Sequence, residues 1–285
     1  MHIEAAAPLF ASSETRPLAE LTLMGLAKAR FASERALLAF AGPEGLTRGL
    51  LDTWVRVGLV RRDDVVLDLS RPEPSPYFAL TREGARQLGG RTISPVFAPS
   101  ASMWRRSAQT RGHDVLIGDF ALAVLRLARE GRVELKGLET DDSKFATSVV
   151  LSSAVGEPQR VALQADAYVL TKSRDHVEGL LVEVDRGTVS LRRMKEKYAG
   201  YLAWARTGGP TRDFAVKAFR LLTLAQNEHR LAELRRVAHE ANDSRRSGFL
   251  LFATTSELDV ATPERFLESV ARVLGDASRV PIFTR

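Results

Sequence analysis

Residues 59–90 read LVRRDDVVLDLSRPEPSPYFALTREGARQLGG, and this stretch decides the fold of the first third of the chain. The runs LVRR, VVLDL and YFAL are rich in β-branched and aromatic residues, which predicts the strands of a β-hairpin. RPEPSP at residues 71–76 is predicted to be the loop at its tip, because proline donates no backbone hydrogen bond. Thr81 is the predicted N-cap of the short helix that follows and ends at Gly89-Gly90.

Three segments upstream of the hairpin have apolar residues at helical spacing. The first begins at Leu18, the second has Ser33 as its expected N-cap, and the third is EGLTRGLLDTWVRVG at residues 44–58. Three helices, a hairpin and a short closing helix form the pattern of a winged helix-turn-helix. The run GLVRR…YFALTREG resembles the wing of many bacterial and archaeal regulators. We therefore expect residues 1–90 to be a DNA-binding domain of this type.

In such a domain the third helix enters the major groove and the wing lies along the DNA backbone. The expected DNA contacts are Thr47 and Arg48 on the helix, with Arg61, Arg62 and Arg71 on the wing. The alternative is a dimerisation or protein-docking module. It is favoured by the charge balance, since residues 1–90 carry as many acidic as basic side chains.

The excess positive charge lies further along the chain. The net charge is +6 and the isoelectric point is about 9.9, which suits a polyanionic partner. Residues 91–111 carry Arg91, Arg105, Arg106 and Arg111 without any acid, together with prolines and serines. This segment is predicted to be a basic linker, and Arg105 and Arg106 join the expected DNA contacts.

Composition excludes several classes of protein. The chain has no cysteine, so disulfides, thiolate metal sites and cysteine nucleophiles are ruled out. The opening MHIEAAAPLF lacks the basic start of a signal peptide, and no apolar run is long enough to span a bilayer. The five histidines show no metal-ligand spacing, and no phosphate-binding loop or dinucleotide fingerprint occurs. We expect a cytoplasmic protein without a membrane partner.

Residues 112–285 alternate between helical and strand patterns, which predicts a mixed sheet flanked by helices. The expected helices are 113–130, 190–206, 227–241 and 263–274, and the expected strands are 132–138, 163–171, 177–184, 218–224 and 248–254.

Three acids stand out in this second domain. Asp166 lies on one strand of an expected hairpin, and Glu183 and Asp185 lie near the end of the next. Residues two apart on a strand share a face, so Glu183 and Asp185 point the same way, and Asp166 can face them. Three carboxylates at a strand end suit Mg²⁺ or Mn²⁺ and a phosphodiester. The alternative is structural: Asp185 caps the following helix, or pairs with Arg186 or Arg192.

This order of elements, with ADAYVL on one strand and LLVEVDRGT on the next, resembles the PD-(D/E)XK nuclease fold. With the wing and the following KEKYAGY, the chain resembles the replication-relaxation family of plasmid and mobile-element proteins. The resemblance implies that Asp166 and Glu183 are the two motif acids. Asp185 stands where an active nuclease has its lysine, so Lys195 or Lys197 from the next helix would have to replace it.

Three functional hypotheses follow from the sequence. The first is a protein that binds double-stranded DNA in the replication, maintenance or regulation of a mobile element, with a nuclease-like domain used for DNA or partner contact. The second is a Mg²⁺-dependent endonuclease or nickase that uses Asp166, Glu183 and Asp185 as metal ligands. The third is an adaptor that docks proteins without catalysis. All three hypotheses are compatible with a homodimer.

Overall fold

The structure is a computed structural model, and it describes residues 18–42, 46–68, 71–89, 98–140, 146–151, 158–173, 176–243, 245, 247–258, 260–276 and 278–283. These residues fall into two compact units. The N-terminal unit is the described part of Pro8–Gly131 with residues 260–263, and the C-terminal unit is the described part of Arg132–Leu258 and Glu264–Arg285. None of the helices in these ranges is long and apolar enough to cross a membrane.

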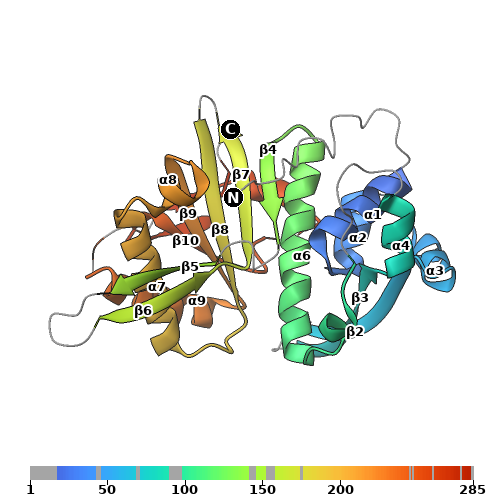
Figure 1. Cartoon of the computed structure of the whole chain (residues 1–285), viewed down its shortest axis with the longest axis horizontal. Helices are drawn as coiled ribbons and strands as arrows, with labels where there is room; N and C mark the ends of the chain where they lie inside the picture. Colours follow the sequence, from blue (N-terminus) through green and yellow to red (C-terminus); the bar gives the residue numbers. More distant parts are fainter. Residues whose placement is uncertain are drawn as a thin grey trace. The chain divides into compact units, whose positions relative to one another are not determined.

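The N-terminal unit combines helices with a small antiparallel sheet (Figure 1). In chain order its elements are α1 (Leu18–Ala29), β1 (Ala32–Ser33), α2 (Glu34–Ala41), α3 (Arg48–Arg56), β2 (Val60–Asp68), β3 (Arg71–Leu80), α4 (Arg82–Gly89), α5 (Ala101–Trp104) and α6 (Ala108–Arg129). The sheet has the strand order β1-β3-β2. Ser33 is the N-cap of α2, as expected, and its Oγ accepts a hydrogen bond from the backbone N–H of Ala36 at 3.1 Å.

The expected proline-rich loop is instead part of a strand. β3 begins at Arg71, and Pro74 and Pro76 pair with Val66 and Asp64 of β2. Backbone N–H groups alternate sides along a strand, so prolines two residues apart leave their missing donors on the same side. That side of β3 faces away from β2. On it β1 pairs only with Tyr77 and Phe78, so no neighbouring strand needs an N–H group from either proline. The hairpin is therefore longer than the sequence predicted.

The expected linker and domain boundary also differ from the structure. Residues 91–97 lie outside the described ranges, but α5 is helical and Met103 is buried against Phe31 and Tyr77. The helix predicted to open the second domain is α6, and it packs on α1, α2, β1 and β2. The N-terminal unit thus runs to Gly131 rather than ending near Gly90. The reason is that α1, α2 and the sheet need α6 to cover their apolar faces.

The C-terminal unit contains a seven-stranded mixed sheet in the order β12-β11-β10-β9-β8-β7-β4. Its elements are β4 (Glu134–Glu139), β5 (Ala146–Leu151), β6 (Gln159–Gln164), β7 (Ala167–Ser173), β8 (His176–Asp185), α7 (Leu191–Arg206), α8 (Gly209–Phe214), β9 (Ala218–Ala225), α9 (Glu228–Ala241), β10 (Ser247–Thr254), β11 (Ala271–Leu274) and β12 (Arg279–Val280). Strands β8, β9 and β10 are parallel, whereas the other neighbours pair antiparallel. The expected mixed sheet with flanking helices is confirmed.

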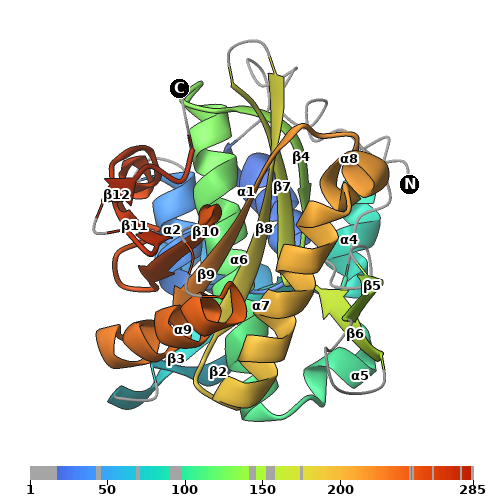
Figure 2. The ribbon, with the colours of Figure 1, turned by 90° about the vertical axis from the view of Figure 1, so that its left-hand side faces the viewer.

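Helices α7 and α9 lie side by side on one face of this sheet (Figure 2). The core beneath them contains the fully buried aromatic side chains of Tyr198, Tyr201 and Trp204. A separate two-stranded sheet, β5-β6, lies across α7 and packs Val161 and Leu163 on it (Figure 1). This hairpin was not predicted.

Two further expectations need correction in the C-terminal unit. The strand expected over 163–171 is two strands, β6 and β7, which are separated at Ala165 and Asp166. The helix expected over 263–274 is a short 3₁₀ turn, Pro263–Leu267, followed by β11. In that segment, pairing with β10 and β12 outweighs the local helical pattern.

Candidate nucleic-acid interface and buried carboxylate centre

Helix α3 presents a charged, exposed face. Thr47 is its N-cap, and the Thr47 Oγ1 accepts a hydrogen bond from the backbone N–H of Leu50 at 3.2 Å. Leu51 and Trp54 bury the opposite face of the helix. Arg48, Asp52 and Arg56 are exposed and four residues apart, so they form one stripe along the helix. Arg56 was not among the contacts predicted from the sequence, although its spacing from Arg48 places it on this stripe.

Two of the predicted DNA contacts on this side have acidic partners. The Nε of Arg48 lies 2.5 Å from Oε1 of Glu34, while the Arg48 side chain stays 79% exposed. Arg62 Nη1 lies 4.0 Å from Asp52 Oδ1. Exposed ion pairs of this kind contribute about 0–1 kcal/mol, so an incoming anion can replace the carboxylate at little cost. Arg56 forms no ion pair with the described residues.

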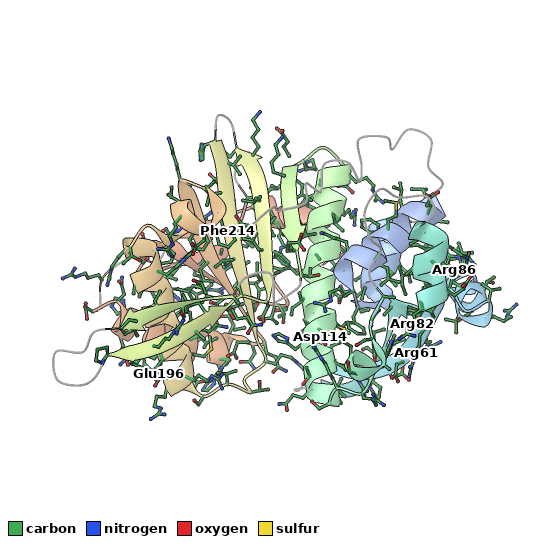
Figure 3. All side chains as sticks on the ribbon, viewed as in Figure 1. Arg61, Arg82, Arg86, Asp114, Glu196 and Phe214 are labelled. Atoms are coloured by element: carbon green, nitrogen blue, oxygen red, sulfur yellow. The ribbon has the colours of Figure 1, made fainter. Side chains whose placement is uncertain are left out.

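Arg61 and Arg62 point to opposite faces of the hairpin, because successive strand residues alternate. Arg62 lies beside Asp52 of α3, whereas the guanidinium of Arg61 lies 4.3 Å from the ring centroid of Trp104 (Figure 3). Trp104 in turn stacks on Tyr77, with centroids 5.9 Å apart. Both arginines were expected to contact DNA from the wing, but only Arg62 lies on the side of α3.

The remaining predicted contacts are scattered over the N-terminal unit. Arg105 is exposed next to Trp104, and Arg106 is 3.1 Å from Asp114 of α6 (Figure 3). Arg71 lies on β3, and its side chain is outside the described part of the chain. Arg82, at the start of α4, is a further exposed arginine that was not predicted as a contact (Figure 3).

The three predicted acids lie at one end of the β7–β8 pair. Ala167 pairs with Val182, so the preceding Asp166 is level with Glu183. The Asp166 Oδ2 accepts a hydrogen bond from the backbone N–H of Val184 at 2.7 Å, which ties this carboxylate to β8. Asp166 is half-buried, whereas Glu183 and Asp185 are each 4% exposed.

Glu183 is held on both carboxylate oxygens by residues of α7. Lys197 Nζ donates to Oε2 at 2.5 Å, and the Tyr201 hydroxyl donates to Oε1 at 2.5 Å. Burial raises the pKa of Glu183 to about 7, although Lys197 opposes the shift. For Lys197, burial lowers the pKa, but the charges of Glu183 and Asp166 outweigh burial and raise it overall. Lys197 is therefore protonated and positively charged in this centre.

The structure distinguishes between the two predicted lysines. Lys197 reaches Glu183 with its side chain 25% exposed. Lys195 lies on the outer surface of α7 and pairs with Glu240 at 2.9 Å. Since only Lys197 meets an acid of the centre, Lys195 drops out as a site residue.

Asp185 has a different environment from Glu183. Arg230 of α9 binds both of its oxygens, Nε to Oδ1 at 2.9 Å and Nη2 to Oδ2 at 3.0 Å. The backbone N–H of Gly187 adds a third hydrogen bond at 2.6 Å. Asp185 is therefore a buried ion-pair partner, as the structural alternative held, but its partner is Arg230 rather than Arg186 or Arg192.

The donor set of this centre does not match the expected metal site. Within the described ranges, no group of three or more His, Asp or Glu side chains is arranged to hold a metal ion. Both oxygens of Glu183 and both oxygens of Asp185 already accept hydrogen bonds from the protein. The residues present do not fit a resident Mg²⁺ or Mn²⁺, which needs several oxygen ligands at about 2.0–2.2 Å.

Comparison with known families decides the identity of the chain. Residues 19–216 match the family described as replication-relaxation, and this range includes α3, Asp166, Glu183 and Lys197. The chain belongs to the replication-relaxation family. Comparison with curated proteins finds no match.

Among solved structures, this replication-relaxation protein is similar to restriction endonuclease FokI. The alignment has 11% identity and a TM-score of 0.27, and it covers 90% of this chain and 71% of that chain. A second structure, FokI bound to DNA, aligns with 9% identity and a TM-score of 0.26 over 90% and 70% of the two chains. At these scores the likeness supports no further argument.

Proposed function

We propose that this replication-relaxation protein binds double-stranded DNA of a plasmid or mobile element, in its replication, maintenance or regulation. The observation that carries the proposal is the stripe of Arg48 and Arg56 on the exposed face of α3. Arginine side chains on one helix face can reach phosphates and guanine edges when the helix lies in the major groove.

The arrangement of the N-terminal unit supports this proposal. Helix α3 follows α2 after a short connection, and the hairpin β2–β3 follows α3, with β1 added to its edge. This is the order of elements in a winged helix-turn-helix, where the helix after the turn contacts DNA. Arg62 on the hairpin lies on the same side as α3, so it is the wing residue best placed to contact the backbone.

In this proposal the C-terminal unit contacts DNA or a partner protein without cleaving DNA. The pairing of Asp185 with Arg230 supports a role without cleavage. Asp185 stands at the position of the lysine in the nuclease motif, and Arg230 neutralises its charge. A Mg²⁺-dependent endonuclease is the second candidate. The position of Asp166 level with Glu183 favours it, whereas the contact between Lys197 and Glu183 counts against it. Nicking of supercoiled plasmid with Mg²⁺ or Mn²⁺ that is lost in Glu183→Ala would support this candidate and contradict a non-cleaving role.

The DNA-binding proposal is tested by fluorescence anisotropy with duplexes of randomised sequence at several salt concentrations. We expect wild type to bind with an affinity that falls as salt rises, because bound arginines release counterions. The double variant Arg48→Ala/Arg56→Ala should bind at least about tenfold more weakly and with a shallower salt dependence.

The matched control is Arg86→Ala, which removes a 73% exposed arginine of α4 that pairs with Glu83 and is not part of the α3 stripe, and it should leave binding nearly unchanged. Binding that is equal in wild type and the double variant would contradict the role of α3. Absence of duplex binding by wild type would favour the adaptor hypothesis.

A further inference from the structure

The carboxylate centre of the C-terminal unit carries its own counter-ions. Lys197 from α7 meets Glu183, and Arg230 from α9 meets Asp185. Both acids are buried, with side chains 6% and 2% exposed. A buried carboxylate without a partner is strongly destabilising, so Lys197 and Arg230 offset the cost of burying Glu183 and Asp185.

Lys197 interacts with both of the motif acids, Asp166 and Glu183. Its ammonium is bonded to Glu183, and its charge also interacts with that of Asp166, the other motif acid. The second oxygen of Glu183 accepts the hydroxyl of Tyr201, which fixes the carboxylate toward α7. A dication placed between the two acids would meet the ammonium at short range, and this repulsion opposes binding.

We propose that the ammonium of Lys197 takes the place of a divalent cation between Asp166 and Glu183, so that the centre is complete without metal. This goes beyond DNA binding by α3, which neither requires nor excludes it. The lysine places a positive charge beside the two acids and joins α7 to β8 at the same time. Removing its charge should therefore convert the centre into a site that takes a divalent cation.

The test is a titration of the full chain with Mn²⁺, followed by calorimetry and by thermal unfolding. Lys197→Met removes the ammonium and keeps an apolar side chain of similar length. Lys195→Met makes the same change two residues away on α7, at a lysine that pairs with Glu240 on the surface. We expect Lys197→Met to bind Mn²⁺ at least about tenfold more tightly than wild type and to melt at a higher temperature as Mn²⁺ increases. Wild type and Lys195→Met should show neither effect.

Adding Glu183→Gln to Lys197→Met should abolish the new binding, which locates it at this centre. The proposal is overturned if wild type binds Mn²⁺ in a way that Glu183→Gln removes, or if folded Lys197→Met gains no binding. A second possible outcome is that Lys197→Met is unfolded in metal-free buffer because Glu183 has lost its counter-ion. In that case Mn²⁺ must restore the fold, and failure to do so overturns the proposal.

Discussion

The carboxylate of Asp119 accepts two hydrogen bonds from Ser33, one from the backbone N–H at 2.8 Å and one from the hydroxyl at 2.7 Å. Asp119 lies on α6, and Ser33 is the N-cap of α2. The contact therefore fixes the start of α2 against α6 within the N-terminal unit. These two hydrogen bonds give Asp119 a structural role.

This contact gives the fold a pH dependence. Burial raises the pKa of Asp119 to about 7, although the two hydrogen bonds from Ser33 oppose the shift. Because the folded pKa lies above the unfolded value, the unfolded chain loses this proton at lower pH than the folded chain does. The contribution of Asp119 to stability is thus full below pH about 4 and declines as pH rises to about 7.

Asp119→Asn should flatten the dependence of unfolding free energy on pH between about 4 and 7, as measured by urea denaturation at a series of pH values. Glu183, whose pKa is also raised to about 7, should account for part of the remaining slope. Glu183→Gln is therefore the companion variant. A slope unchanged by Asp119→Asn would show that this carboxylate does not titrate as described.

The ion pair between Asp185 and Arg230 should contribute to stability. Asp185→Asn leaves Arg230 with a neutral partner in a buried position, so we expect a loss on the order of 1–3 kcal/mol and a lower melting temperature. Arg230→Met should cost at least as much, because it leaves the acid without a cation. The double variant should lose less than the sum of the two. A higher melting temperature in Asp185→Asn would indicate that the acid is under repulsion instead.

Arg61 and Arg62 should separate two roles, since they lie on opposite faces of the hairpin. Arg62→Ala should weaken duplex DNA binding severalfold and leave stability nearly unchanged. Arg61→Ala removes the contact with Trp104, so we expect it to cost about 0.5–1 kcal/mol of stability with little effect on DNA affinity. Anisotropy and chemical denaturation of the same two samples check both halves. An equal loss of affinity in both variants would contradict the separation.

Gly118 should be indispensable to the N-terminal unit. A Cβ at this position of α6 would lie 1.6 Å from the carbonyl oxygen of Phe31 and 2.9 Å from that of Ala29. These are backbone atoms, so the clash cannot be relieved by a rotamer change. We expect Gly118→Ala to destabilise the unit by several kcal/mol or to prevent soluble expression. Gly89→Ala, at a site where a Cβ meets no atom within 4 Å, is the control.

Local sequence determined many of the elements and the residues of the carboxylate centre. Ser33 caps α2 because its hydroxyl bonds two to three residues ahead, which requires no distant partner. The bounds of α7, β9, α9 and β10 follow from apolar periodicity and from nearby capping or turn residues. Glu183 and Asp185 are placed near the end of β8 by strand alternation alone.

Tertiary structure alone decided which charges meet. Asp185 and Arg230 are 45 residues apart, and Glu183 and Lys197 are 14 apart, so no local pattern selects these pairs. The same holds for Met103 and Trp104, in a segment that reads as a linker until the hairpin face offers it an apolar surface. β11 is a strand because β10 and β12 supply its hydrogen bonds. Local propensity amounts to a fraction of a kcal/mol per residue, and burial and pairing with distant segments outweigh it wherever they occur.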